Sequence, residues 1–152
     1  MKSIISKTMM LVAIAATLVS FTNFGGEGFE IYLDNKIVLQ RFGNTLNEVT
    51  SLQLNQQSAN SQLTIKYHHC GKVGKSRVIT IKDGQDKILK QWRFNDAATP
   101  VAAMNCNVKD ILTLKKGTEA ILKLYYSSSE LPNGRLLTNI VVLNNNSVAS
   151  NQ

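Results

Sequence analysis

The sequence predicts an all-β fold, an antiparallel β-sandwich of about eight strands. Apolar and polar residues alternate along most of the chain, turn-forming residues recur at roughly 8–15-residue intervals, and no amphipathic helix follows the N-terminal segment. The 152 residues are 43% hydrophobic and include nine Gly, two Pro and two Cys. This composition is typical of one globular domain, and it excludes collagen-like, coiled-coil and disulfide-stapled miniature proteins.

The N-terminal segment has the composition of a signal peptide. Lys2 and Lys7 precede an uncharged, mostly apolar run over residues 8–21, shorter than the ~20 residues that a membrane-spanning helix needs. The predicted organisation is a signal peptide over residues 1–24 with cleavage between 20 and 28, one domain over residues 28–143, and a flexible polar tail over residues 144–152. We therefore expect an exported, periplasmic or extracellular protein with no transmembrane span in the mature chain.

The first half of the domain contains two predicted hairpins. Asp34-Asn35 suits a two-residue turn because both residue types tolerate a positive φ angle, and Asp83-Gly84 is the strongest hairpin signal in the chain. The predicted strands of this half are residues 29–33, 36–42, 49–54, 63–70, 77–82 and 87–94.

The second half is less regular. Residues 95–107 are predicted to form a long crossover loop with at most one turn of helix. Strands are predicted at 108–114, 119–126 and 135–143, with turns at 115–118 and 131–134. The last strand is apolar on both faces, which is typical of a central strand.

Two cysteines, Cys70 and Cys106, bear on both fold and function. An even cysteine count in an exported chain predicts a disulfide, which would close a loop of about 36 residues and add about 4 kcal/mol of stability. Immunoglobulin domains also have the order Cys, Trp, Cys, but the spacing of Cys70, Trp92 and Cys106 differs from theirs. The predicted sandwich therefore resembles the immunoglobulin fold only loosely.

A soft-metal site is the alternative for the same region. His68, His69 and Cys70, with Met104 and Cys106, offer imidazole, thiolate and thioether groups, which are the ligands that copper selects. The single loop that usually gathers such ligands is absent, so no cofactor is predicted. Copper binding through His68, His69 and Cys70 remains the second hypothesis for function.

No catalytic residues are predicted. The carboxylates fall mostly in turns or on expected surfaces, and Ser127-Ser128-Ser129 lacks the Gly-x-Ser-x-Gly context of a nucleophile. No phosphate-binding glycine loop or zinc-ligand spacing occurs either. We therefore expect a protein that is not an enzyme.

A binding surface is predicted on an outer sheet face, where lysines beside an aromatic ring would suit a flat acidic or sugar partner. Its residues are Trp92, Lys90, Lys66, Lys82 and Lys123. The competing interpretation places Trp92 in the core with Ile88 and Phe94, while the charged end of Lys90 reaches solvent.

Net charge limits the class of partner. The chain carries 17 Lys and Arg against 10 Asp and Glu, a net charge of +7 that falls to +5 without Lys2 and Lys7. No long basic run occurs, so a nucleic-acid partner is not predicted. The predicted function is that of a monomeric, non-catalytic binding or envelope-associated module with an unknown protein or glycan partner.

Overall fold

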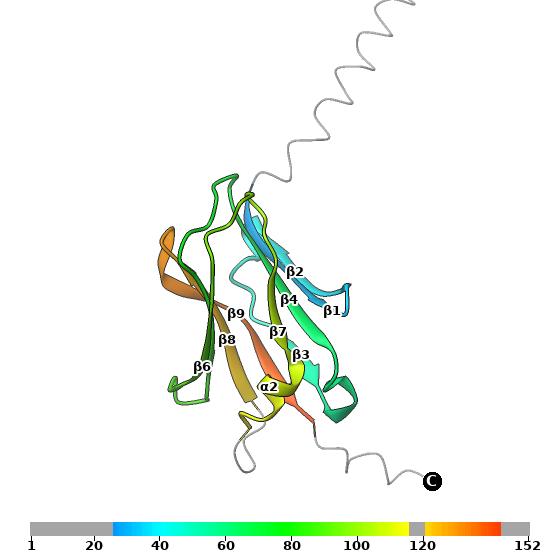
Figure 1. The fold of residues 1–152 in the computed structure, drawn as a ribbon. Coiled ribbons are helices and arrows are strands. Elements are labelled where there is room, and N and C mark those ends of the chain that lie inside the picture. The colour runs from blue at the N-terminus through cyan, green and yellow to red at the C-terminus, as the bar shows by residue number, and fades with distance from the viewer. Residues whose placement is uncertain (1–25, 116–120, 144–152) are drawn as a thin grey trace, which may run out of the picture.

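The structure, a computed structural model, describes residues 26–115 and 121–143, which form a β-sandwich of nine strands in two facing sheets (Figure 1). The four-stranded sheet has the order β2 (Lys36–Phe42), β1 (Glu27–Leu33), β4 (Gln62–His69), β7 (Met104–Asn107). The five-stranded sheet has the order β3 (Ser51–Leu54), β9 (Leu131–Val142), β8 (Ile121–Ser128), β5 (Arg77–Lys82), β6 (Ile88–Phe94). The predicted signal peptide, most of the predicted 115–118 turn and the predicted C-terminal tail lie outside the described residues.

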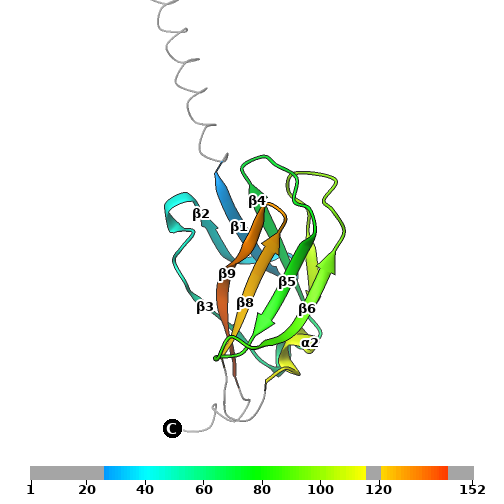
Figure 2. The ribbon, with the colours of Figure 1, turned by 90° about the vertical axis from the view of Figure 1, so that its left-hand side faces the viewer.

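The sheet topology confirms the predicted sandwich and its loose likeness to immunoglobulin domains. Strands β1, β4 and β7 pack against β6, β5, β8 and β9, which matches the order A-B-E against C′-C-F-G of an immunoglobulin-type sandwich. Figure 2 shows the five-stranded sheet from its outer side. One pair departs from the antiparallel prediction, because β3 runs parallel to β9. The chain leaves the four-stranded sheet after β2 and joins the other sheet at its edge.

Both predicted hairpins are confirmed. Asp34 and Asn35 have φ angles of 47° and 67°, as a two-residue turn with positive φ at both positions requires, and they join β1 to β2. Strands β5 and β6 pair through the turn that contains Asp83 and Gly84. In that turn the Asp83 carboxylate accepts hydrogen bonds from the backbone N–H groups of Gln85 and Lys87.

The core lies between the two sheets and is built from the alternate residues of each strand. Phe29 and Ile31 of β1 are fully buried, as the alternation predicts. The other fully buried strand residues include Leu63 and Ile65 of β4, Ile79 and Ile81 of β5, Leu124 and Tyr126 of β8, and Ile140 of β9. Strand β9 lies between β3 and β8, which confirms that it is a central strand.

Two predictions around residue 108 are wrong. The end of the predicted 95–107 loop is β7, an edge strand that pairs with β4, and the predicted strand at 108–114 begins as a short helix, α2 (Val108–Leu112). Val108, Ile111 and Leu112 are buried because their spacing places them on one side of a helix. This helix closes one end of the sandwich (Figures 1 and 2).

The predicted turn at residues 131–134 is also displaced. Ser129 and Glu130 form the turn between β8 and β9, and Leu131 already pairs with Ser128. Gly134, with a φ angle of 70°, lies where the β8–β9 register shifts. The Pro-Asn-Gly sequence therefore forms an irregularity within the hairpin, because a bulge needs the same turn-forming residues as a loop.

Candidate functional site

The two cysteines do not pair, so the disulfide prediction is wrong. Cys70 is exposed and free, and Cys106 is buried and free. Cys106 lies opposite Leu63 at the start of β4, whereas Cys70 follows the last residue of that strand. Seven residues of extended chain at ~3.3 Å each separate the two positions by about 23 Å, and a disulfide needs Cα atoms within about 7 Å.

The proposed metal ligands are also dispersed. His68 and His69 are consecutive strand residues, so their side chains lie on opposite faces of the four-stranded sheet. Met104 is buried opposite Ile65, four residues before His69. Within residues 26–115 and 121–143, no group of three His, Cys, Asp or Glu side chains could hold a metal ion.

The predicted binding-surface residues lie in three places. Lys82 and Lys123 are opposite each other on the outer face of the five-stranded sheet, where the Lys82 ammonium lies 4.2 Å from the ring centroid of Tyr125. Trp92 and Lys90 line up with core residues Ile79 and Ile81, and Trp92 packs against the core. The Lys90 ammonium lies 3.0 Å from the Asp110 carboxylate and 5.0 Å from the Trp92 ring centroid.

Lys66 belongs to a different surface, the outer face of the four-stranded sheet. We call this surface the Glu30 face and define it by Glu30, Tyr32, Gln40, Phe42, Lys66 and His68. The strand register brings these side chains together: Gly28 lies between Phe42 and His68, and Glu30 lies between Gln40 and Lys66. They point outward because their neighbours Phe29, Ile31, Ile65 and Tyr67 fill the core.

Glu30 is the centre of this face. Its carboxylate accepts a hydrogen bond from the Tyr32 hydroxyl at 2.9 Å and a longer one from the Gln40 amide at 3.4 Å. Nε2 of His68 lies 3.7 Å from the same carboxylate. The hydrogen bond to Glu30, followed by burial, raises the pKa of Tyr32, so the phenol stays protonated and keeps donating.

The rings of Phe42 and Tyr32 flank the Glu30 carboxylate, and each is held in place by a neighbouring side chain. The Phe42 ring packs over Gly28 and meets the His68 ring edge-on, with centroids 5.0 Å apart. The Lys66 ammonium lies 4.7 Å from the Tyr32 ring centroid. Thr64 lies opposite Tyr32 in the strand register, and its hydroxyl donates to the Asn105 side-chain oxygen at 2.8 Å. The hydrogen-bonded polar groups of this face therefore reach the edge strand β7.

On the inner side of the same strands lies a buried polar network. Nε2 of His69 is 2.8 Å from the Tyr126 hydroxyl and 3.3 Å from the Ser128 hydroxyl. The Tyr67 ring stacks on Tyr126 with centroids 4.3 Å apart, and its hydroxyl donates to Glu27. Five side chains from β1, β4 and β8 thus satisfy one another within the sandwich.

Burial sets the protonation of this network. It lowers the pKa of His69, although the carboxylates of Glu130 and Glu27 act in the opposite direction. Burial and the hydrogen bond to Glu27 raise the pKa of Tyr67. At neutral pH the network therefore consists of a neutral imidazole and protonated phenols, with Arg135 placed 3.3 Å from the Glu27 carboxylate as its counter-ion.

Sequence reasoning named Lys66 as a binding-surface residue and His68 as a metal ligand, and it named none of the other four residues of this face: Glu30, Tyr32, Gln40 and Phe42. The missing signal is the pairing of β1 with both β2 and β4, which places residues from distant positions on one face. Alternation alone indicates that Glu30 points outward, but it does not say which residues lie beside it.

No helix in the described ranges, 26–115 and 121–143, is long and apolar enough to cross a membrane. No protein-family model matches the chain, and no curated protein matches it either. The chemistry of the Glu30 face is therefore the guide to function.

Proposed function

We propose that this chain is an exported, monomeric, non-catalytic binding module, and that the Glu30 face binds a glycan. One observation carries the proposal: a single carboxylate fixes the Tyr32 phenol, accepts a long hydrogen bond from the Gln40 amide and lies beside the His68 imidazole on an outward-facing sheet. Side chains that are held before the ligand arrives lose little conformational freedom on binding.

The groups on this face have the chemistry that sugars require. A pyranose ring presents C–H groups on its flat faces and hydroxyl groups around its rim. Phe42 and Tyr32 supply aromatic surface, and Glu30 and Gln40 supply planar hydrogen-bonding groups. The Gln40 amide donates to Glu30 only at 3.4 Å, so a sugar hydroxyl can compete for this carboxylate oxygen.

The charge on the face favours a neutral glycan. Lys66 is balanced by Glu30, which is its register partner across β1 and β4. A surface for a polyanion needs an excess of positive charge, and this face has none. A protein-docking surface usually has an apolar centre, whereas the centre of this face is a carboxylate.

The non-catalytic part of the proposal is supported by the way in which the carboxylates are used. Glu27 and Glu30 each accept hydrogen bonds from neighbouring side chains, and Ser128, whose hydroxyl lies 3.3 Å from His69, is buried beside a second partner of that histidine. Export is supported by the charged and apolar pattern of residues 1–24.

Affinity electrophoresis tests the glycan proposal. In a native gel that contains a polysaccharide, a protein that binds this polysaccharide migrates more slowly. The panel is three neutral polysaccharides (a β-glucan, a xylan and a galactomannan) and the anionic polysaccharide alginate. We expect retardation by at least one neutral polysaccharide, and Tyr32→Ala should weaken it about tenfold or more, as loss of a central aromatic contact does.

Tyr125→Ala is the matched control. Tyr125 also lies on an outer sheet face with a lysine ammonium over its ring, at 4.2 Å from Lys82, but it belongs to the opposite sheet. The control variant should bind as the wild type does. Retardation by alginate alone, by no polysaccharide, or with equal loss in both variants would contradict the proposal.

A further inference from the structure

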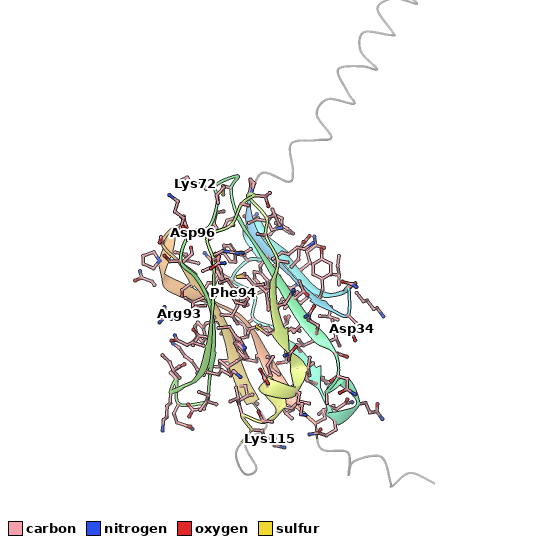
Figure 3. All side chains as sticks on the ribbon, viewed as in Figure 1. Asp34, Lys72, Arg93, Phe94, Asp96 and Lys115 are labelled. Atoms are coloured by element: carbon pink, nitrogen blue, oxygen red, sulfur yellow. The ribbon has the colours of Figure 1, made fainter. Side chains whose placement is uncertain are left out.

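A groove of about 590 Å³ opens beside the start of β5 and the end of β6, on the five-stranded sheet and away from the Glu30 face. It is lined by Ser76, Arg77, Val78, Arg93, Phe94, Asn95 and Asp96. Figure 3 shows Arg93 pointing away from the sandwich and Phe94 pointing into it, with Asp96 above them near the end of the molecule that carries Lys72.

The walls of the groove are fixed by hydrogen bonds. The buried guanidinium of Arg77 donates from Nε and Nη2 to the Asn95 carbonyl, at 3.1 and 2.8 Å, and from Nη1 to the Ala102 carbonyl at 2.9 Å. The backbone N–H of Ser76 donates to Oδ1 of Asp96 at 2.8 Å. These bonds hold the segment after β6 against the segment before β5, so the groove exists before any ligand binds.

Besides the Arg77 guanidinium, whose N–H groups are taken by the two carbonyls, two opposite charges line this groove without neutralising each other. The Arg93 side chain has no hydrogen bond or ion pair with any other residue in the described part of the chain, and Arg93 lies beside Val78 in the strand register. Asp96 uses one oxygen for Ser76 and makes no ion pair with Arg93, since no cation among the described residues lies within 4.0 Å of its carboxylate.

From this arrangement we propose that the groove binds a small zwitterion of the amino-acid class. Arg93 receives the ligand carboxylate, for which its planar fork of N–H groups is suited, and the free oxygen of Asp96 receives the ammonium group. Val78 is the apolar neighbour of Arg93 and contacts the carbon side chain. A simple anion meets the repulsion of Asp96, and a simple amine meets that of Arg93, so each binds more weakly than a ligand that carries both charges.

The test compares leucine with two analogues that each lack one charge: 4-methylpentanoate, which has no amine, and 3-methylbutylamine, which has no carboxylate. Binding is followed by two-dimensional ¹H–¹⁵N NMR of the folded protein, through the backbone signals of residues 76–78 and 93–96. Leucine should shift these signals and bind at least tenfold more tightly than either analogue.

Two variants separate the roles of the charges. Arg93→Gln should abolish the response to leucine and to 4-methylpentanoate. Asp96→Asn keeps the acceptor for Ser76 but removes the charge, so leucine should bind no better than 4-methylpentanoate. Lys87→Gln, in the turn at the other end of β6, removes a surface charge outside the groove and should change nothing.

Equal affinity for leucine and 4-methylpentanoate in the wild type would show an anion site and overturn the proposal. Leucine is added from a 20-fold excess over the protein up to its solubility limit. If the backbone signals of residues 76–78 and 93–96 do not shift over this range, the proposal is overturned as well. Neither result bears on glycan binding, because Tyr32 and the Glu30 face belong to the other sheet.

Discussion

Replacing Gly28 with alanine tests whether the Phe42 ring is seated on β1 as the Glu30 face requires. A Cβ atom at this position would lie 2.0 Å from Cδ1 of Phe42 and 2.7 Å from the Arg41 carbonyl oxygen. The φ angle of Gly28 is not positive, so alanine costs no backbone strain there and the effect is steric. The ring must leave its place and lose its contact with His68, which together should cost about 2–3 kcal/mol.

Urea unfolding at pH 7.5, followed by far-ultraviolet circular dichroism, measures this cost. The same substitution is then made in a Phe42→Ala background, where no ring is present to clash. There Gly28→Ala should cost at least about 1 kcal/mol less, because only the approach to the Arg41 carbonyl remains. An equal cost in the two backgrounds would refute the reasoning, since it would assign the whole clash to the backbone.

Four further predictions follow from the interior and from the sequence. Tyr126→Phe removes the hydroxyl that is 2.8 Å from His69 and should destabilise the fold by about 1–2 kcal/mol, a fall of about 4–8 °C in Tm. Because burial lowers the pKa of His69 from 6.5, the unfolded chain takes up a proton that the folded chain resists; stability should therefore decrease as the pH falls below about 6.5. His69→Gln should flatten that part of the pH profile, and an unchanged profile would argue against a buried neutral imidazole. Iodoacetamide without reductant should modify Cys70 in the folded protein but reach Cys106 only in denaturant, because burial raises the pKa of the Cys106 thiol to about 12; two thiols that appear only after reduction would contradict the free cysteines. The intact mass of the exported protein should lack 20–28 N-terminal residues, whereas a full-length mass would contradict cleavage of the predicted signal peptide.

The features that sequence predicted well are those that neighbouring residues determine. The Asp34-Asn35 and Asp83-Gly84 turns are encoded locally, and the alternation of Phe29 and Ile31 identifies the buried face of β1 without knowledge of its partners. The likeness to immunoglobulin domains also follows from the number and spacing of strands rather than from the spacing of Cys70, Trp92 and Cys106.

The features that the sequence predicts poorly depend on the pairing of distant strands. The even cysteine count predicts a disulfide, but the β4–β7 register places Cys70 and Cys106 at opposite ends of β4. The Glu30 face could not be assembled for the same reason, because Gln40 and Lys66 meet beside Glu30 only once β1 is placed between β2 and β4. For α2 the signal was present, since Val108, Ile111 and Leu112 have helical spacing, but so short a segment fits a strand equally well.

The parallel pairing of β3 with β9 has a consequence for the order in which the chain can fold. The two strands are about 88 residues apart in sequence, and the Thr138 hydroxyl donates to the Thr50 carbonyl across that interval. The edge of the five-stranded sheet therefore cannot close until β9 has been synthesised, and such long-range pairing is slow.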